Sequence, residues 1–378
     1  MPSAPTVDQV TQALATVDDP EIHRPITELG MVDSVEVDTD GRVRVGVLLT
    51  IQGCPLHDTI KRDVTLAVAK LPGVTGVDVA FGVMTDEQRQ SLQGRLMGDR
   101  GAREIPFAKP DSLTRVYAVA SGKGGVGKSS LTVNLAVAMA GLGRKVGIVD
   151  ADIYGHSVPK MMGVTDQPTQ VEQMMMPPSA DGIPVISIGM FTAGNSPVVW
   201  RGPMLHRALE QFLADVYWGD LDVLFLDLPP GTGDIAISVA QLIPPAEILV
   251  VTTPQQAAAE VAERAGAIVV QTHQRIAGVI ENMSWLACPH CGEQVDVFGS
   301  GGGHAVTEAL SRIVGAHVPL LGQVPMDLRL RERSDTGDPL VRCEPDSPAA
   351  KEIRAIADQL SARGRGLAGR PLGLTPVS

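Results

Sequence analysis

Aromatic residues are scarce in this chain: Phe, Trp and Tyr together make up only 3% of its 378 residues, whereas 40 glycines and 28 prolines interrupt the sequence. With 44% hydrophobic and 20% charged residues, the composition is nevertheless that of a globular protein and not of a disordered one. The core must therefore be built from Val, Ile, Leu, Ala and Met. Such a core favours Val- and Ile-rich parallel strands joined by glycine-containing turns.

Positive charge is also in deficit, because 31 Lys and Arg residues face 43 Asp and Glu residues, a net charge of −12. This balance argues against a large nucleic-acid surface. There is no N-terminal basic-then-apolar signal segment and no apolar run of about 18 residues, so we expect no membrane partner and a cytoplasmic location. The four cysteines, Cys54, Cys288, Cys291 and Cys343, are too few for a disulfide scaffold. Cysteines of a reducing compartment are more often metal-binding or catalytic.

The sequence predicts an α/β protein with two domains. We expect a small α/β domain over residues 1–90, a Gly- and Pro-containing linker over 91–112, a nucleotide domain over 113–362 and a flexible tail over 363–378. The Asp40-Gly41 pair predicts a hairpin turn in the small domain. The elements expected around this turn are a helix at Val7–Thr16, strands at Val32–Val37 and Val43–Leu49, a helix at Leu56–Lys70 and a strand at Val74–Phe81.

From Arg115 onward, short apolar runs alternate with helix-length segments. This alternation predicts a mainly parallel sheet flanked by helices on both faces. The apolar runs are Val116–Ala120, Val146–Val149, Val185–Ile188, Val223–Leu226, Ile248–Val251, Ile276–Ile280 and Pro319–Val324.

The most specific motif is Gly122-Lys-Gly-Gly-Val-Gly-Lys-Ser129, which fits the phosphate-binding loop pattern and lies between an apolar run and the helical stretch Ser130–Ala140. Lys128 would contact the β- and γ-phosphates of ATP, and Ser129 would ligate Mg²⁺. The additional Lys123 is either a solvated loop cation or a catalytic lysine that reaches a phosphate in a partner subunit. We expect nucleotide contacts from Gly122, Lys123, Gly124, Gly125, Val126, Gly127, Lys128, Ser129 and Ser130.

Carboxylates follow two of the apolar runs, where ligands of open α/β sheets bind. Asp227 opens the string Asp-Leu-Pro-Pro-Gly-Thr-Gly-Asp and is assigned to Mg²⁺, while Asp152 is the candidate that orients the attacking water. The alternative for each, and more so for Asp150, is a helix N-cap. The Pro-Pro-Gly-Thr-Gly stretch is a candidate sensor of the γ-phosphate.

Cys288 and Cys291 form a C-x-x-C pair in a loop after the Ile276–Ile280 run. The flanking Pro289 and Gly292 favour a metal-binding knuckle over a redox pair, whereas zinc and an iron–sulfur cluster remain equal alternatives. Because either metal site takes four ligands, other residues of the chain or a second copy must complete it. The candidates within the chain are Cys54, Cys343, His290 and His304.

These motifs together resemble the Mrp/ApbC iron–sulfur carrier ATPases, which share the deviant Walker A loop of the MinD/ParA class. The resemblance covers residues 113–345 and implies a homodimer with a [4Fe–4S] cluster bridging two C-x-x-C pairs. It also implies that Lys123 is the signature lysine and that Asn282 contacts adenine. The strings that carry it are Asp150-Ala-Asp-Ile-Tyr-Gly-His-Ser-Val-Pro159, Asp227–Asp234, Val251-Thr-Thr-Pro-Gln255 and Glu281-Asn-Met-Ser284.

The N-terminal region resembles the small domain once called domain of unknown function 59, which is linked to metal–sulfur cluster assembly. The resemblance rests on Asp19-Pro-Glu-Ile, Pro25–Val32 and Gly53-Cys-Pro-Leu56. Cys54 is then either a transient cluster ligand or a thiol without a role, at a helix start that would lower its pKa. Cys343 lies in no motif and is expected to be a buried or incidental thiol.

The resulting hypothesis is an ATPase that carries a [4Fe–4S] cluster and delivers it to apoproteins, with iron–sulfur assembly proteins as further partners. ATP hydrolysis would be coupled to loading or release of the cluster. One alternative is a ParA/MinD-like positioning ATPase. The glycines that follow the expected last helix, Ala349–Leu360, argue against the basic membrane helix of that class. A narrower alternative is an ATPase that inserts nickel or zinc.

Overall fold

In the computed structural model the chain divides into two units. One comprises Met1–Ala102 with Pro168–Pro177, and the other comprises Arg103–Gln167 with Pro178–Ser378. Cys54 and the tail from residue 364 lie outside the described residues. The described residues are 4–20, 22, 24–49, 57–85, 87–88, 91–92, 104–109, 111–152, 155, 157–171, 174–191, 202–231, 234–255, 266, 269–272, 274–288 and 290–363.

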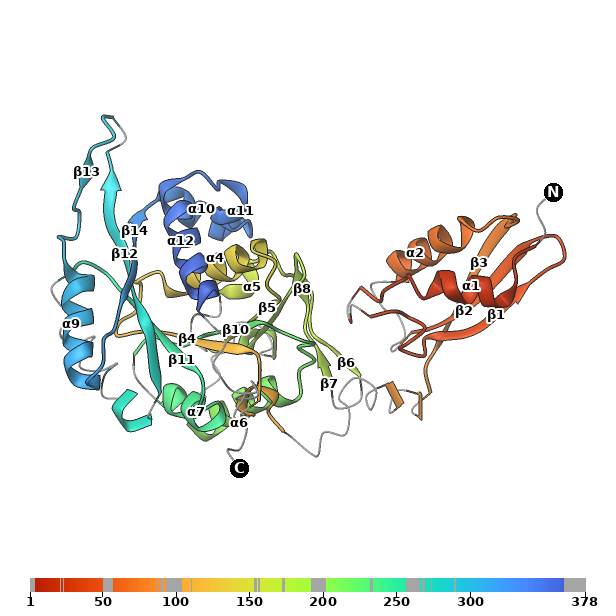
Figure 1. The fold of residues 1–378 in the computed structure, drawn as a ribbon, viewed down its shortest axis with the longest axis horizontal. Helices are drawn as coiled ribbons and strands as arrows, with labels where there is room; N and C mark the ends of the chain where they lie inside the picture. The colour runs from red at the N-terminus through yellow and green to blue at the C-terminus, as the bar shows by residue number, and fades with distance from the viewer. Residues whose placement is uncertain are drawn as a thin grey trace, which may run out of the picture. The chain divides into compact units, whose positions relative to one another are not determined.

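The first unit is built on a three-stranded sheet of β1 (Val32–Val37), β2 (Arg42–Leu49) and β3 (Gly76–Val83) (Figure 1). β1 and β2 are antiparallel, and β2 and β3 are parallel. Helices α1 (Val7–Leu14) and α2 (His57–Ala69) cover one face of this sheet. The expected helix–hairpin–helix–strand order of the N-terminal region is therefore present.

Buried and more exposed residues alternate along β2. Because every second side chain of a strand points to the same face, the buried ones face the helices. Gly41 makes the predicted turn before β2 with a φ of 77°, and a Cβ at this position would lie 2.1 Å from the Gly73 carbonyl oxygen. Only glycine fits there. The buried residues of the sheet and its helices include Val10, Leu14, Val43, Val45, Val47, Leu49, Ile60, Val64 and Val68.

An antiparallel hairpin also belongs to the first unit, although its sequence lies inside the expected nucleotide domain. Its strands are β6 (Thr169–Val171) and β7 (Met174–Met176). Val171, Met174 and Met176 are buried. The apolar runs of the sequence do not predict this hairpin.

The second unit contains a nine-stranded sheet with the order β13-β12-β11-β4-β10-β5-β9-β8, and β14 lies beside β12. All pairs are parallel except those of β13 with β12 and β8 with β9. The predicted mainly parallel sheet is confirmed. The strands are β4 (Arg115–Ser121), β5 (Val146–Asp150), β8 (Ser179–Ala180), β9 (Ile183–Ser187), β10 (Val223–Asp227), β11 (Glu247–Thr252), β12 (Arg275–Ala287), β13 (Gln294–Val295) and β14 (Leu320–Met326).

Helices lie on both faces of this sheet, as predicted. Alternate side chains of β4 point to opposite faces: Tyr117 and Val119 belong to the core below α4 (Lys128–Gly141), and Ala118 and Ala120 face α7 (Asp234–Leu242). The other helical elements are η1 (Pro106–Ala108), α5 (Val158–Met161), η2 (Ile188–Phe191), α6 (Gly202–Ala214), α9 (Gly302–Val314), α10 (Leu328–Thr336), α11 (Leu340–Cys343) and α12 (Pro348–Ala362).

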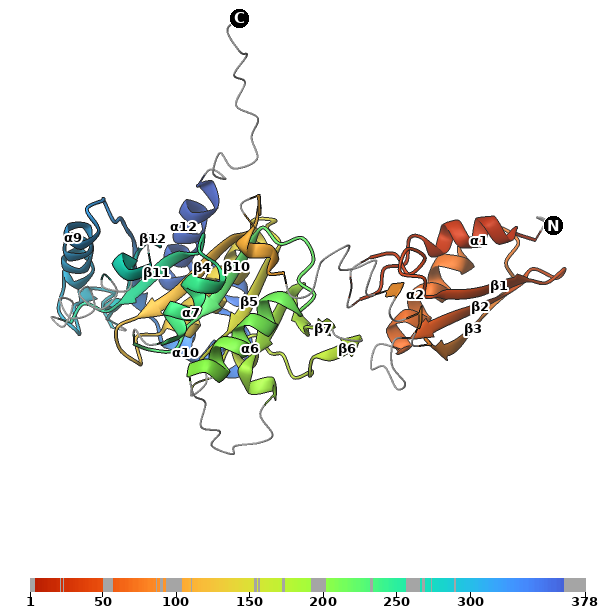
Figure 2. The same cartoon turned by 90° about the horizontal axis from the view of Figure 1, so that it is seen from below.

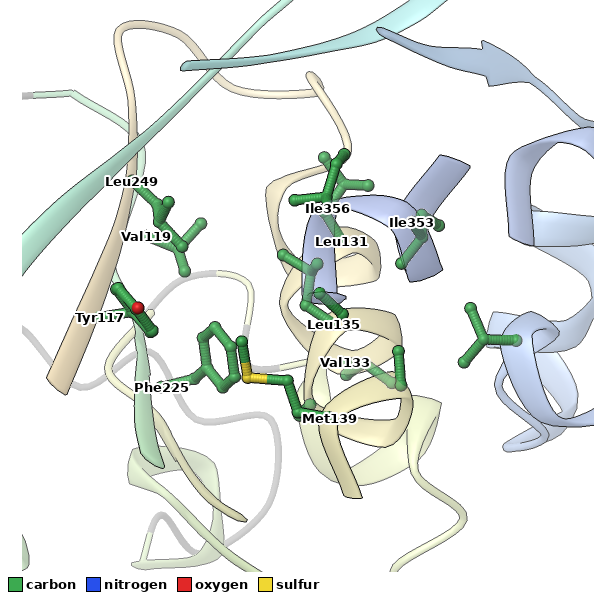
Figure 3. Close-up of a cluster of buried hydrophobic side chains, with 14 of the residues drawn as sticks. Tyr117, Val119, Leu131, Val133, Leu135, Met139, Phe225, Leu249, Ile353 and Ile356 are labelled. Carbon is green, nitrogen blue, oxygen red and sulfur yellow. The ribbon is translucent and has the colours of Figure 1, made fainter. Parts of the chain in front are cut away.

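The main core lies between the sheet and the pair α4 and α12. In Figure 3, Leu131, Leu135 and Met139 of α4 have the sheet on one side and α12 on the other. Phe225 is one of the sheet residues, and Ile353 belongs to α12. The opposite face carries α6 and α7, which lie in front of the sheet in Figure 2. Burial on both faces explains why the strands of this unit are continuous apolar runs.

One local expectation is wrong, and one alternative of another is excluded. The run Ile276–Ile280 is only the first part of β12, which continues to Ala287, because Asn282 and Leu286 also pair with β14 and Leu286 pairs with β13. Cys343 is exposed at the end of α11, which excludes the buried alternative and leaves the incidental one. In addition, Arg363 of the expected tail donates hydrogen bonds to Ala277 O and to Glu247.

Candidate functional site

The phosphate-loop motif joins the centre of the sheet to a helix. It connects β4 to the N-terminus of α4, and the helix begins at Lys128 after Gly127. Gly125 and Gly127 have φ values of 76° and 80°, which L-residues rarely adopt. Loop N–H groups and the helix N-terminus together form a site suited to phosphate.

The strand order brings the loop to Asp227. β10 lies between β4 and β5, so that Asp227 is opposite Val119 on one side and Asp150 on the other. The carboxyl ends of the three strands therefore meet at one edge of the sheet. This edge adjoins the loop, as expected for an open α/β sheet.

Asp227 is the centre of a buried polar cluster. Its Oδ1 lies 2.6 Å from Lys128 Nζ, and its Oδ2 accepts a hydrogen bond of 2.5 Å from Ser129 Oγ. Thr132 Oγ1, one helical turn after Lys128, donates to Oδ1 at 3.1 Å. Only 5% of the Lys128 side chain and 1% of the Asp227 side chain are exposed. The structure thus brings together the three residues assigned to phosphate and Mg²⁺.

Asp150 is a second buried carboxyl group beside this cluster. Its Oδ2 accepts hydrogen bonds from Ser187 Oγ at 3.1 Å and from the Val158 N–H at 3.2 Å. Burial, together with the nearby negative charge of Asp227, raises the pKa of Asp150 to about 8. The group is therefore mainly neutral at pH 7. It anchors the start of α5 to the end of β9.

The candidates Asp152 and Ser130 make other contacts. Asp152 is buried, its N–H donates to Asp150 Oδ1 at 3.1 Å, and its own Oδ1 accepts the Gly155 N–H at 3.1 Å. Ser130 Oγ lies 3.9 Å from the sulfur of Met161 in α5. Both residues thus contact the segment from Asp150 through α5.

The Lys123 side chain makes a contact within its own chain. Its ammonium group donates a hydrogen bond to Gln255 Oε1, in the segment that follows β11. Its backbone carbonyl accepts from Ser121 Oγ at 3.0 Å. The side chain is therefore bound within its own chain.

Asn282 connects the phosphate loop with β12. Its Nδ2 donates to the Val126 carbonyl oxygen at 2.8 Å, and it is 2% exposed. A Cβ on Gly127 would lie 2.2 Å from this Nδ2. The next residue, Met283, has a φ of 57°, an uncommon value for a non-glycine residue. β12 is therefore fixed to the loop at Asn282.

The cysteine pair lies at the end of β12, in the turn to β13 of the projecting hairpin (Figure 1). The Cys288 N–H donates to Glu293 O at 2.8 Å, and the Gly292 N–H donates to Cys288 O at 2.9 Å. Hydrogen bonds from the backbone N–H groups of Cys291 and His290 lower the pKa of the Cys288 thiol. Cys291 is exposed and Cys288 is partly exposed.

Other ligands do not complete this pair in the described part of the chain. No group of three or more His, Cys, Asp and Glu residues with metal-site geometry occurs there. Cys343 is at the end of α11, and His304 is exposed near the start of α9. Cys54 lies outside the described residues.

Three polar contacts of the nucleotide site were not predicted from the sequence. Thr132 follows Lys128 by four residues on a helix, so helical spacing alone was a signal. Ser187 ends β9, and ligands of open α/β sheets bind at the carboxyl ends of strands, so its position was also a signal. Gln255 ends the string Val251-Thr-Thr-Pro-Gln255, but the string alone indicates no role for its side chain.

The strand–loop–helix geometry, the buried lysine and the strand-end aspartate define a nucleotide-binding P-loop NTPase. The model of the NUBPL iron-transfer P-loop NTPase family matches residues 112–361, and that of the iron-sulfur cluster assembly protein family matches residues 7–79. The chain therefore belongs to the family of NUBPL-type iron-transfer P-loop NTPases, with an N-terminal iron–sulfur cluster assembly domain.

Several named relatives are similar over nearly the whole chain. The iron-sulfur cluster carrier protein of Mycobacterium bovis is 65% identical over 97% of this chain and 96% of its own length. The protein of the same name from Deinococcus radiodurans is 40% identical over 94% of both chains. A nucleotide-binding protein from Archaeoglobus fulgidus, solved in complex with ADP and with cobalt found, is 34% identical with a TM-score of 0.53. The match spans 65% of this chain and 96% of that one.

Among the described helices, none is both long and apolar enough to cross a bilayer.

Proposed function

We propose that this protein is an ATP-dependent carrier that binds a [4Fe–4S] cluster as cargo between two copies of the chain and delivers it to apoproteins. Binding and hydrolysis of ATP are coupled to loading or release of the cluster. The names of the relatives and the family match support the carrier function. Iron–sulfur assembly proteins are the expected donors, and the N-terminal unit is the expected cluster-assembly domain.

One observation carries the proposal: a single strand connects the two sites. β12 contacts the phosphate loop through Asn282 and Val126, and it ends directly before Cys288. A change of the loop on binding or hydrolysis would therefore reach the thiols through the last six residues of β12, Asn282–Ala287. Asn282 is also the residue proposed to contact adenine.

The residues of the nucleotide site fit ATP with Mg²⁺. Ser129 Oγ and Asp227 Oδ2 are oxygen donors 2.5 Å apart, and Mg²⁺ prefers oxygen ligands. Ser129 would hold the ion directly and Asp227 through water, while Lys128 neutralises phosphate charge. Mg²⁺ would stabilise the charge that develops on the phosphates. Asp152 is proposed to orient the attacking water, and Lys123 to reach the nucleotide of the second copy.

The cysteine pair fits a shared cluster. A [4Fe–4S] cluster takes four thiolates, and each chain offers two in the exposed turn. Backbone N–H groups aimed at Cys288 favour its thiolate form, the form that binds metal. The hairpin also exposes Val295 and Val297 beside the thiols, apolar surface that a second copy would cover. A twofold dimer therefore completes the ligand set.

Anaerobic reconstitution with iron and sulfide tests cluster binding. About four irons and four sulfides per dimer are expected, and they should be lost in Cys288→Ala/Cys291→Ala. Cys343→Ala is the matched control, because Cys343 is also an exposed thiol but lies outside the hairpin. Stoichiometric zinc or nickel that resists replacement would contradict the iron–sulfur cargo, and the absence of any metal would contradict the carrier function.

Cluster transfer to an apoprotein tests the coupling. Transfer rates should differ between ATP, ADP and no nucleotide, and Lys128→Ala should remove that difference. Identical rates under the three conditions would contradict coupling, even if the cluster itself binds.

A further inference from the structure

Lys123 and Gln255 come from two loops at the same edge of the sheet. Lys123 follows β4 and Gln255 follows β11, and these neighbouring parallel strands place Ser121 opposite Val251. The Lys123 ammonium group donates to Gln255 Oε1, although the two residues are 132 positions apart. Among its described contacts, this one fixes the end of the long Lys123 side chain.

The position of Gln255 is itself fixed by packing. Thr253 and Pro254, directly before it, are buried against the start of α9. A Cβ on Gly302 would lie 2.7 Å from the carbonyl oxygens of both residues. The neighbouring Gly303 N–H donates to Glu281 Oε2 of β12 at 2.5 Å. The backbone directly before Gln255 is therefore held by packing, and the exposed Gln255 side chain extends from a fixed point.

We infer that Gln255 is a positioning residue that holds Lys123 within its own subunit and so competes with the reach of Lys123 to the nucleotide of a second copy. This inference rests on the proposed ATP-dependent dimer. Closure of the dimer must break the Lys123–Gln255 hydrogen bond. Because the acceptor is a neutral amide near solvent, the bond is weak enough to be broken reversibly.

The contact also connects the lysine with the cysteine hairpin. The segment that carries Cys288 and Cys291 leaves the nucleotide site at Asn282 and returns to it at Gly302, against Thr253 and Pro254. Release of Lys123 thus takes place beside the point where the cysteine segment is fixed.

Two substitutions separate this role from a structural one. Gln255→Ala removes the acceptor, and Gln255→Glu replaces it with a carboxylate that binds the ammonium group more strongly. Gln241→Glu is the matched control, since Gln241 is an exposed glutamine of α7 in the same unit. A general disturbance of the loop would change Gln255→Ala and Gln255→Glu in the same direction.

The first measurement needs neither dimer nor cluster. Reductive methylation of Lys123 in the nucleotide-free, full-length protein is followed by mass spectrometry, with Lys128 as the buried internal reference. Methylation of Lys123 should be about two- to fivefold faster in Gln255→Ala and slower by a similar factor in Gln255→Glu, as for an exposed ionic contact. Equal rates in all variants would overturn the inference.

The second measurement is the ATPase rate per chain as a function of protein concentration. The concentration at half-maximal rate should fall about two- to fivefold in Gln255→Ala and rise similarly in Gln255→Glu. Shifts in one common direction would overturn the inference. A rate that is independent of concentration in the unsubstituted protein would instead contradict the proposed dimer, while the methylation result would still stand.

Discussion

The nucleotide site and the cysteine hairpin lie on the same sheet, but they differ in whether their side chains have partners within one chain. At the nucleotide site, Lys128 and Asp227 are buried and paired within one chain. At the hairpin, two thiols stand in an exposed turn beside the two-residue strand β13. A buried charge must have its partner in the same fold, because an unpaired one is costly. Exposed thiols carry no such cost, because water solvates them, so their further ligands can come from another molecule.

The comparison implies that the two sites contribute differently to stability. The nucleotide site should be part of the folding core, and the hairpin should not.

Lys128→Ala should lower the free energy of unfolding of the second unit by about 3–5 kcal/mol and abolish ATP hydrolysis. The reason is that the buried Asp227 carboxylate loses the ammonium group 2.6 Å away. Urea unfolding measures the change. Lys123→Ala is the control and should change the free energy by about 1 kcal/mol or less. Similar small losses in both variants would show that the buried pair does not support the fold.

Gly127→Ala should cost about 2–3 kcal/mol, since it combines a left-handed φ of 80° with a Cβ placed 2.2 Å from Asn282 Nδ2. Gly125→Ala isolates the backbone contribution and should cost about 1 kcal/mol, because its φ is 76° but no atom lies within 4 Å of the added Cβ. Urea unfolding of both variants and of Gly127→Ala/Asn282→Ala provides the comparison. No recovery in the double variant would contradict the close contact.

The pH dependence of stability should report Asp150. Its pKa is about 8 in the folded protein and 3.8 for a free, solvated aspartate side chain, so the folded state retains this proton more tightly. The stabilisation is complete at low pH and is lost as the pH rises from about 4 to about 8, with a slope of up to about 1.4 kcal/mol per pH unit. Above about pH 8 it should stop falling.

Asp150→Asn should lack this part of the slope. Urea unfolding in a chelating buffer at several pH values between about 5 and 9 measures it. Asp358→Asn, an exposed carboxylate of α12, is the control and should keep the slope of the unsubstituted protein. A slope unchanged in Asp150→Asn would show that the folded protein holds Asp150 charged.

Cys288→Ser/Cys291→Ser should leave the urea midpoint of the second unit unchanged, because both thiols lie in the exposed turn. Cluster binding should nevertheless be lost. Cys343→Ser provides the matched stability control. A clear fall in the midpoint would place the hairpin in the folding core and remove the distinction between the two sites.

Much of the fold could be predicted because its signals are local. Apolar runs located β4, β5, β10 and β11 to within two residues, and the Asp40-Gly41 turn occurs as expected. The β6–β7 hairpin could not be predicted, because its strands have three residues each. The full length of β12 was also missed, since its second half is stabilised by pairing with β13 and β14.

The candidate site also has a part that local sequence signals predict and a part that they do not. Lys128, Ser129 and Asp227 were recognisable because phosphate binding requires particular residues at short spacing or at strand ends. The contact of Lys123 with Gln255 and the neutral form of Asp150 had no such signal. Each depends on a residue far away in the sequence: Gln255 in one case, and Asp227 in the other.

The phosphate loop, the strand positions and the cysteine pair could therefore be located from short stretches of sequence. Backbone preference, hydrophobic periodicity and ligand spacing act over short stretches of chain. Three properties depend on the folded structure: which carboxyl group becomes neutral, which residue binds Lys123, and that β12 joins the phosphate loop to the thiols. Those properties arise from burial and from the order of strands in the sheet, which place residues side by side that are more than 70 positions apart.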